Sequence, residues 1–219
     1  MPQYAMNKLC ILSFLLILPA LGRASDLNPI DHFAKTGVRP TRALDLWDAS
    51  AADPKLYKQV FLKSQAPALS ELRGRAFKGV ITYLHNGALG KLILDGVVTE
   101  RFGDFLSGRH YLRPYLFEDR FFAQDDAQGR SGVNFLPSVG HENLPMKLEL
   151  GPSFLDPAGE SVKIDYDLPE NSSFTRPTID ELRRIPGSDL YIGQSFMRLK
   201  HLKSLPVLWF FFKPDRPYP

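Results

Sequence analysis

Cysteine is almost absent from this chain. The one cysteine among the 219 residues, Cys10, lies in an apolar segment near the N-terminus. A single cysteine excludes an intrachain disulfide and a cysteine-based metal site. Small secreted domains of eukaryotes usually rely on disulfides, so an exported chain without them fits a bacterial periplasm better.

Long apolar runs are also missing, and the one short run stands at the N-terminus. Lys8 precedes it, residues 9–18 are apolar apart from Ser13, and small residues follow up to Ala24. This order of a charged start, a short apolar stretch and small residues is typical of a cleavable signal peptide. A membrane anchor is the alternative, but such an anchor needs roughly 20 apolar residues. We therefore predict a signal peptide over 1–24 and a periplasmic or secreted location.

Charge of one sign is not in large excess. The chain has 27 basic and 24 acidic residues, and the predicted signal contains Lys8 and Arg23 but no acidic residue, so cleavage lowers the net charge from +3 to +1. A near-neutral protein lacks the electrostatic footprint of a nucleic-acid-binding domain. We expect no nucleic-acid partner. The rest of the chain is long enough for one domain with a hydrophobic core.

Motifs for cofactors, metals and nucleophiles are lacking as well. No P-loop or dinucleotide fingerprint occurs, so we expect no nucleotide cofactor. The five histidines show no metal-ligand spacing, so we expect no metal site. The Gly-x-Ser-x-Gly of a nucleophile elbow is absent, and Ser107 near His110 is interpreted as part of a polar loop. His110 remains the weak candidate for a catalytic base.

What is present begins with a helical pattern over residues 25–74. A short helix around Trp47 is predicted to open at Thr41. A second helix is predicted from Asp53, because this N-cap residue is followed by proline at the first helical position, to Ser64. These helices are expected to pack on a sheet formed by the rest of the chain.

After residue 74 the apolar residues alternate with polar ones. Alternation interrupted by turn residues is typical of antiparallel strands. The predicted strands cover 77–83, 91–99, 110–122, 132–137, 146–150, 162–168, 190–197 and 207–212. Thr178 and Glu181 have the spacing of a capping box, which predicts one late helix over 178–185. Residues 199–206 are basic and are predicted to form the turn before the last strand.

The clearest alternation is in the strands at 146–150 and 162–168. Val162 and Ile164 share one face, and Lys163 and Asp165 share the other. This pattern predicts a two-stranded ribbon with one buried face and one face toward water. Asp165 and Asp167 are therefore interpreted as solvated rather than as an acid-base pair.

Strands of this length and spacing predict a closed barrel or a sandwich. Closure removes the edge strands through which sheets aggregate. An outer-membrane barrel is the alternative, and the helical N-terminal segment and the charged outward positions argue against it. We predict a mainly β fold: an antiparallel eight-stranded barrel over 75–219, with short N-terminal helices over 25–74 and one late helix.

The layout of residues 76–213 resembles that of lipocalin-like proteins. The block Asp-Glu-Leu-Arg-Arg-Ile-Pro-Gly at 180–187 and the Leu-Tyr-Ile-Gly at 190–193 look like a helix-turn-strand block of uncharacterised bacterial lipocalin-like proteins. The first predicted strand lacks the Gly-x-Trp signature of the classical family. The resemblance implies an eight-stranded barrel whose interior holds one small hydrophobic or amphipathic ligand, such as a lipid or a fatty acid.

Aromatic side chains on several strands are candidates to line such an interior. Small-molecule pockets are mostly apolar and aromatic, with a few polar groups that orient the ligand. A filled core is the alternative interpretation of the same residues. The predicted ligand-binding residues are Tyr83, Tyr166, Tyr191, Phe196 and Trp209, with Arg198 and Lys200 near the mouth.

Three functions stay open on the sequence alone. The leading hypothesis is an exported binding protein for a small hydrophobic or amphipathic ligand, with no integral membrane segment after signal cleavage. The second is a hydrolase or isomerase that acts on a lipophilic substrate in the same barrel and uses His110. The third is a ligand-free interaction or envelope protein that contacts partners through the helices around Trp47.

Overall fold

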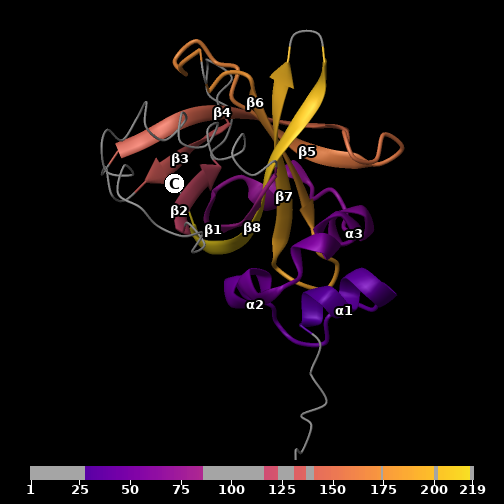
Figure 1. Ribbon diagram of the computed structural model, residues 1–219. Helices are drawn as coiled ribbons and strands as arrows, with labels where there is room; N and C mark the ends of the chain where they lie inside the picture. Colours follow the sequence, from indigo (N-terminus) through magenta and orange to yellow (C-terminus); the bar gives the residue numbers. More distant parts are fainter. Residues whose placement is uncertain are drawn as a thin grey trace, which may run out of the picture.

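The computed structural model describes residues 28–85, 116–122, 131–136, 141–173, 175–199 and 202–217. Short helices come first, followed by strands (Figure 1). The helices are α1 (Pro29–Thr36), α2 (Leu46–Ala51), α3 (Tyr57–Lys63) and α4 (Leu69–Leu72), with a 3-10 turn, η1 (Pro54–Leu56), before α3. The strands are β1 (Arg75–Leu84), β2 (Leu116–Phe122), β3 (Gly132–Leu136), β4 (His141–Pro152), β5 (Glu160–Asp165), β6 (Thr178–Arg184), β7 (Tyr191–Leu199) and β8 (Leu202–Pro217).

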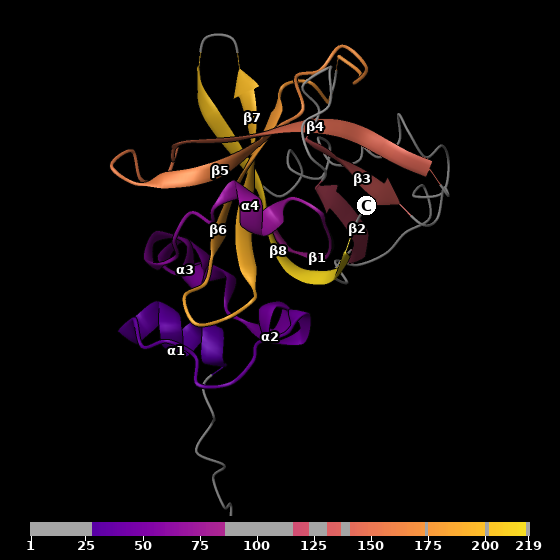
Figure 2. The same cartoon turned by 180° about the vertical axis from the view of Figure 1, so that it is seen from behind.

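Every described strand pairs antiparallel with its neighbours in the chain. The last strand, β8, pairs both with β7 and with β1, so the hydrogen-bonded order closes from β1 round to β8. The strands curl around a common interior in both views of the ribbon (Figures 1 and 2). The prediction of a mainly β, antiparallel, barrel-like fold is confirmed. The exact strand count stays a prediction, because the strand expected at 91–99 lies outside the described residues.

The late helix predicted over 178–185 is wrong, because this segment forms strand β6. It pairs with β5 on one side and with β7 on the other. Asp180 and Leu182 point to one face of the sheet, while Glu181 and Arg183 lie on the other. The capping-box spacing favours a helix locally, but pairing on both edges satisfies the backbone of the whole segment. Tertiary pairing therefore overrides the local signal.

The turn predicted over 199–206 is also wrong in length. Leu199 already pairs with Leu202, so β7 and β8 form a hairpin that continues well beyond the predicted strand ends. The pairing shifts register twice near the hairpin, between Ser195 and Phe196 and between Met197 and Leu199. Such bulges increase the local twist of a hairpin. Residues 202–206, predicted as part of the turn, therefore belong to strand β8.

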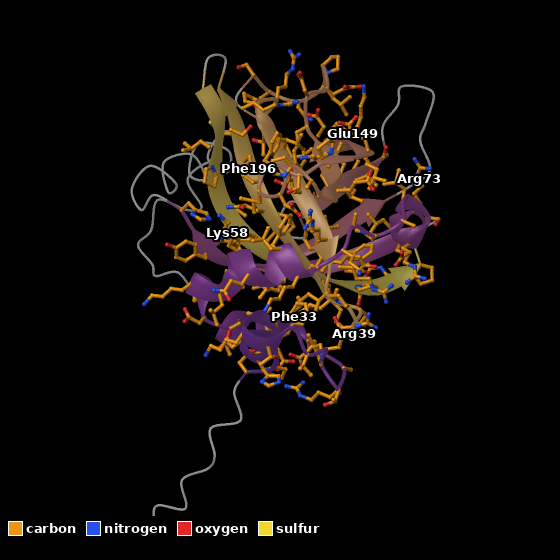
Figure 3. The ribbon with its side chains drawn as sticks, turned by 90° about the vertical axis from the view of Figure 1, so that its right-hand side faces the viewer. Phe33, Arg39, Lys58, Arg73, Glu149 and Phe196 are labelled. Atoms are coloured by element: carbon orange, nitrogen blue, oxygen red, sulfur yellow. The ribbon has the colours of Figure 1, made fainter. Side chains whose placement is uncertain are left out.

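The N-terminal helices cover the outer face of β7, β8 and β1. Ile192, Trp209 and Phe211 point outward from the strands and pack with apolar residues of α1 to α3 in one buried cluster. The ring centroids of Phe61 and Trp209 are 5.8 Å apart in an edge-on arrangement. Figure 3 places Phe33 inside this helical layer, below the strands. The helices thus form a second layer outside the barrel.

Aspartate side chains cap the starts of α2 and of the turn η1. Asp45, rather than the predicted Thr41, caps α2: its carboxylate accepts from the backbone N–H groups of Trp47 and Asp48 at 2.8 and 3.0 Å. Asp53 accepts from the N–H of Lys55 at 3.0 Å and begins the turn that leads into α3, as predicted. None of the described helices has the length and apolar character needed to cross a membrane.

A buried tyrosine links the helical layer to the sheet and gives a pH prediction. The hydroxyl of Tyr57 donates to the carbonyls of Ala49 and Ala52 at 3.1 and 3.3 Å, and burial raises the pKa of Tyr57 to about 12. A phenol in the unfolded chain has a pKa of about 10. The neutral phenol therefore stabilises the fold fully below about pH 10, and this contribution is lost as the pH rises through about 12.

We expect Tyr57→Phe to remove that part of the alkaline loss of stability. The variant also loses the two hydrogen bonds, which lowers its stability at neutral pH by about 1 kcal/mol. Urea unfolding of both proteins from neutral to alkaline pH measures the difference. If the stabilities of the two proteins fall in parallel as the pH rises, the pKa of Tyr57 does not differ between the folded and the unfolded state.

Candidate functional site

The inner face of the sheet is apolar over most of its described length. Side chains from β1 and from β4 to β8 pack there in one buried cluster with Leu72 of α4. Two glycines make room for rings from β8: a Cβ atom on Gly79 would overlap the Phe212 ring, and one on Gly193 would overlap the Phe210 ring. The interior at this level is therefore filled with phenylalanine side chains.

One group of polar side chains interrupts this apolar face. Asp180 of β6 is paired in register with Ile164 of β5 and Ser195 of β7. The hydroxyl of Ser195 donates a short hydrogen bond to Oδ1 of Asp180, and the hydroxyl of Tyr166 donates to Oδ2 at 3.3 Å. We call Asp180, Ser195 and Tyr166 the interior polar cluster.

The interior polar cluster is almost completely removed from solvent. Asp180 is 1% exposed and Tyr166 is 3% exposed. A buried carboxylate is costly unless hydrogen bonds replace its lost hydration. The strand register supplies two such donors, because it places β7, with Ser195, and the end of β5, which Tyr166 follows, on either side of Asp180. The cluster therefore depends on the tertiary fold.

Solvent exposure rises slightly along the inner face toward this cluster. Leu182 and Phe210, at the level of the filled core, are 0% and 1% exposed. At the level of Asp180, Ser195 is 6% exposed and Leu208 is 7% exposed. Strand pairing places Ser195 beside Leu208 on the same face. All four side chains are nevertheless buried, and Ile164, at the same level on β5, is 0% exposed.

The outer face of the same strands carries a different charged group. Glu181 of β6 is paired in register with Lys163 of β5, and the two side chains form an ion pair. Ser153 and the backbone N–H of Phe154 also donate to the Glu181 carboxylate, at 2.8 and 2.6 Å. Arg183 reaches Asp156 at 3.2 Å. These residues fix the segment 153–159 against the sheet.

This arrangement corrects the predicted one-sided ribbon. The pairing of β4 with β5 is confirmed, but Lys163, expected to face water, is only 5% exposed. The ring of Phe154 lies over its ammonium group, at 3.7 Å from nitrogen to centroid. Burial lowers the pKa of Lys163, and the neighbouring Glu181 opposes that shift. On this outer face, Lys163 of β5 is therefore buried, and Asp167, which follows β5, is exposed.

A second polar contact lies on the outer face beside the helices. Nε2 of Gln194 is 2.9 Å from Nε2 of His85, and burial lowers the pKa of this histidine. Gln194 is buried, and its Oε1 accepts no hydrogen bond from any residue that the structure describes. The His85 ring also contacts Tyr83 and Trp209. This contact joins the end of β1 to β7 and is separate from the interior polar cluster.

The predicted aromatic set does not converge on one space. Tyr166 and Tyr191 point into the interior, where Tyr191 contacts Phe77 edge-on at 5.4 Å between ring centroids. Trp209 belongs to the outer cluster with the helices, and Tyr83 is exposed and paired in register with it. Phe196 also lies on the outer side, against Phe154.

The predicted basic mouth is described only in part. Arg198 binds both carboxylate oxygens of Asp165, at 2.6 and 2.9 Å. It therefore lies on the outer side of the sheet, next to β5. Lys200 and the candidate base His110 lie outside the described residues.

Sequence reasoning missed Asp180 and Ser195. Alternation in the strand predicted over 190–197 places Ser195 on the same face as Tyr191, so the alternation alone could have predicted that Ser195 faces the interior. The inward position of Asp180 could not be predicted in this way, because the sequence favours a helix over 178–185 and side chains of a helix do not alternate between two faces. In the described part of the chain, no group of three or more histidine, cysteine or acidic side chains is placed to hold a metal ion.

Comparisons with known proteins add no further assignment. No protein-family model, no curated protein and no solved structure matches this chain.

Proposed function

We propose that this protein binds a small hydrophobic or amphipathic molecule in the interior of its barrel, beside Asp180. The observation that carries the proposal is the interior polar cluster, which lies within an otherwise apolar inner face. Ligand sites of soluble proteins combine apolar walls with a few convergent polar groups in this way.

The proposal includes the finer features expected from the sequence. The fold is a lipocalin-like, eight-stranded barrel, and the chain is exported through a signal peptide over 1–24 to the periplasm or outside the cell. The apolar run after Lys8 and the lack of cysteine beyond Cys10 support export. The closed strand order supports the barrel.

Burial of apolar surface would supply most of the affinity. Each Å² of apolar ligand surface removed from water contributes roughly 25 cal/mol, from which the loss of ligand freedom is subtracted. The interior polar cluster would orient the ligand and add little to the binding free energy, because a buried hydrogen bond contributes only about 1 kcal/mol net. The walls nearest to the cluster are Leu148, Ile164 and Leu208.

Native mass spectrometry tests the proposal even though the ligand is unidentified. The mature protein is purified from its native compartment, its intact mass is measured, and the sample is then extracted with solvent. A stoichiometric adduct that passes into the solvent establishes a carrier. A clean mass that stays clean after incubation with lipids and with an apolar fluorescent probe would contradict it.

A larger side chain at position 195 tests whether the ligand binds beside Asp180. We expect Ser195→Leu to weaken binding of the probe N-phenyl-1-naphthylamine by about tenfold or more, a difference of at least 1.4 kcal/mol. The added side chain would extend into the interior beside Asp180, where the proposed ligand would lie. Ser70→Leu makes the same change at an exposed position of α4 and serves as the control. Thermal unfolding shows that both variants fold, and equal probe affinity in both would rule out this site.

A further inference from the structure

We propose that His85 and Gln194 form a pH-responsive contact on the outer face of the barrel, in which the Gln194 amide rotates when the His85 ring gains a proton. The neutral ring accepts a hydrogen bond from Nε2 of Gln194, and the imidazolium donates one to Oε1 of the same amide. The basis of this inference is the 2.9 Å contact between the two side chains. The contact lies outside the interior polar cluster and does not depend on the proposed ligand site.

The contact between His85 and Gln194 crosses strand β8. This strand pairs with β1 on one side and with β7 on the other, and His85 follows β1 while Gln194 lies on β7. Gln194 pairs in register with Trp209 of β8, and the centroids of the His85 and Trp209 rings are 6.1 Å apart. The backbone N–H of His85 donates to the carbonyl of Val207 at 2.6 Å. Main-chain and side-chain contacts together therefore hold the imidazole beside Trp209.

The observed arrangement requires a neutral imidazole with its proton on Nδ1. The side-chain nitrogen of a glutamine carries two hydrogens and only donates. Nε2 of His85, which lies 2.9 Å from Nε2 of Gln194, must therefore be the acceptor. A neutral histidine that accepts through Nε2 keeps its proton on Nδ1. Burial lowers the pKa of His85, which also favours the neutral ring.

Protonation of His85 would reverse the direction of this hydrogen bond. Both nitrogens of an imidazolium donate, so Nε2 of Gln194 could no longer donate to the ring. Gln194 is 1% exposed, and its Oε1 accepts no hydrogen bond from the described residues. A half-turn of the amide brings Oε1 to the imidazolium as an acceptor. The face of the Trp209 ring would add a cation–π attraction, so the end of β1 stays joined to β7 in both states.

The charge of other described side chains does not control this change. The side chains that face the imidazole are Tyr83 of β1, Gln194 of β7 and Trp209 of β8. The phenol of Tyr83 is the one other titratable group among these three, and none of them carries a fixed charge. Burial is the cause that lowers the pKa of His85, with no contribution from a charged group among the described residues. The protonation of His85 alone therefore decides which amide atom it meets.

The emission of Trp209 reports the protonation of His85. The chain has two tryptophans, and Trp47 is 80% exposed, so Trp47→Phe leaves a single emitter without disturbing the core. An imidazolium beside an indole quenches its fluorescence. We expect the emission to fall in acid with a midpoint below about pH 6.5, the ordinary pKa of histidine. His85→Phe in the same background should remove this transition.

Gln194→Glu in the Trp47→Phe background tests the role of the amide. A carboxylate accepts hydrogen bonds but donates none, and its charge favours the imidazolium. The midpoint should therefore rise by about one pH unit or more. The matched control, Gln65→Glu, makes the same change at an exposed position that bridges to Arg184 at the end of β6. It should leave the midpoint nearly unchanged, because exposed charges are screened by solvent.

Nitrogen-15 NMR of the unaltered protein tests the two states directly, even if a variant fails to fold. Above the midpoint we expect the proton of His85 on Nδ1 and none on Nε2. Below it we expect the side-chain NH₂ signals of Gln194 to shift with the same midpoint as the imidazole. A proton on Nε2 of the neutral ring, or a midpoint that Gln194→Glu does not raise, would overturn the proposal. Either result leaves the proposed ligand site untouched.

Discussion

Glu181→Ala is expected to lower the free energy of unfolding by about 3–5 kcal/mol, the cost of breaking a buried ion pair. The carboxylate of Glu181 is fully buried and accepts hydrogen bonds from Lys163, Ser153 and the backbone of Phe154. Its removal leaves the Lys163 ammonium buried beside apolar side chains. It also releases the segment 153–159 from the sheet.

Urea unfolding of the mature protein measures this loss. Glu149→Ala is the matched control, because Glu149 also faces Lys163 across the sheet but is exposed. We expect the control to change stability by less than about 0.5 kcal/mol. Replacing both partners, in Lys163→Met with Glu181→Leu, should recover much of the loss, because no buried charge remains unpaired. A loss in Glu181→Ala no larger than in the control would show that the pair is solvated in the protein.

Gly193→Ala is expected to lower the stability by about 1–3 kcal/mol, the usual range for an overpacked core. The new Cβ would overlap the Phe210 ring and would lie 2.8 Å from the backbone oxygen of Glu181. Phe210 is buried in the barrel core and cannot turn into solvent. Gly151→Ala is the control, since its Cβ would meet only Lys163 at 3.9 Å, an ordinary contact.

Second-site changes distinguish ring overlap from backbone overlap. At Gly79, the Cβ would overlap only the Phe212 ring, and the nearest backbone oxygen, that of Phe211, is 3.4 Å away. Phe212→Leu should therefore offset much of the loss in Gly79→Ala. Phe210→Leu should offset less of the loss in Gly193→Ala, because the oxygen of Glu181 remains in contact. Equal recovery at both glycines, judged from the two double-mutant cycles by urea unfolding, would contradict this account.

Several elements were predictable because their signals are local. Asp53 followed by proline begins the turn into α3 as expected. The alternation around Val162 and Ile164 places β5 beside β4, with these two residues buried. In each of these places the residues that determine the local structure are close together in the chain.

The sequence by itself determined that this is a mainly β, antiparallel fold preceded by short helices, because alternation and helix capping depend on neighbouring residues. The tertiary structure decided which faces of the strands are buried. Residues 178–184 form strand β6 and not a helix, and Lys163 is buried with Glu181 on the outer face. It also brought Asp180 together with Tyr166 and Ser195 inside the barrel. These contacts join residues up to 18 positions apart, and only strand pairing fixes their register.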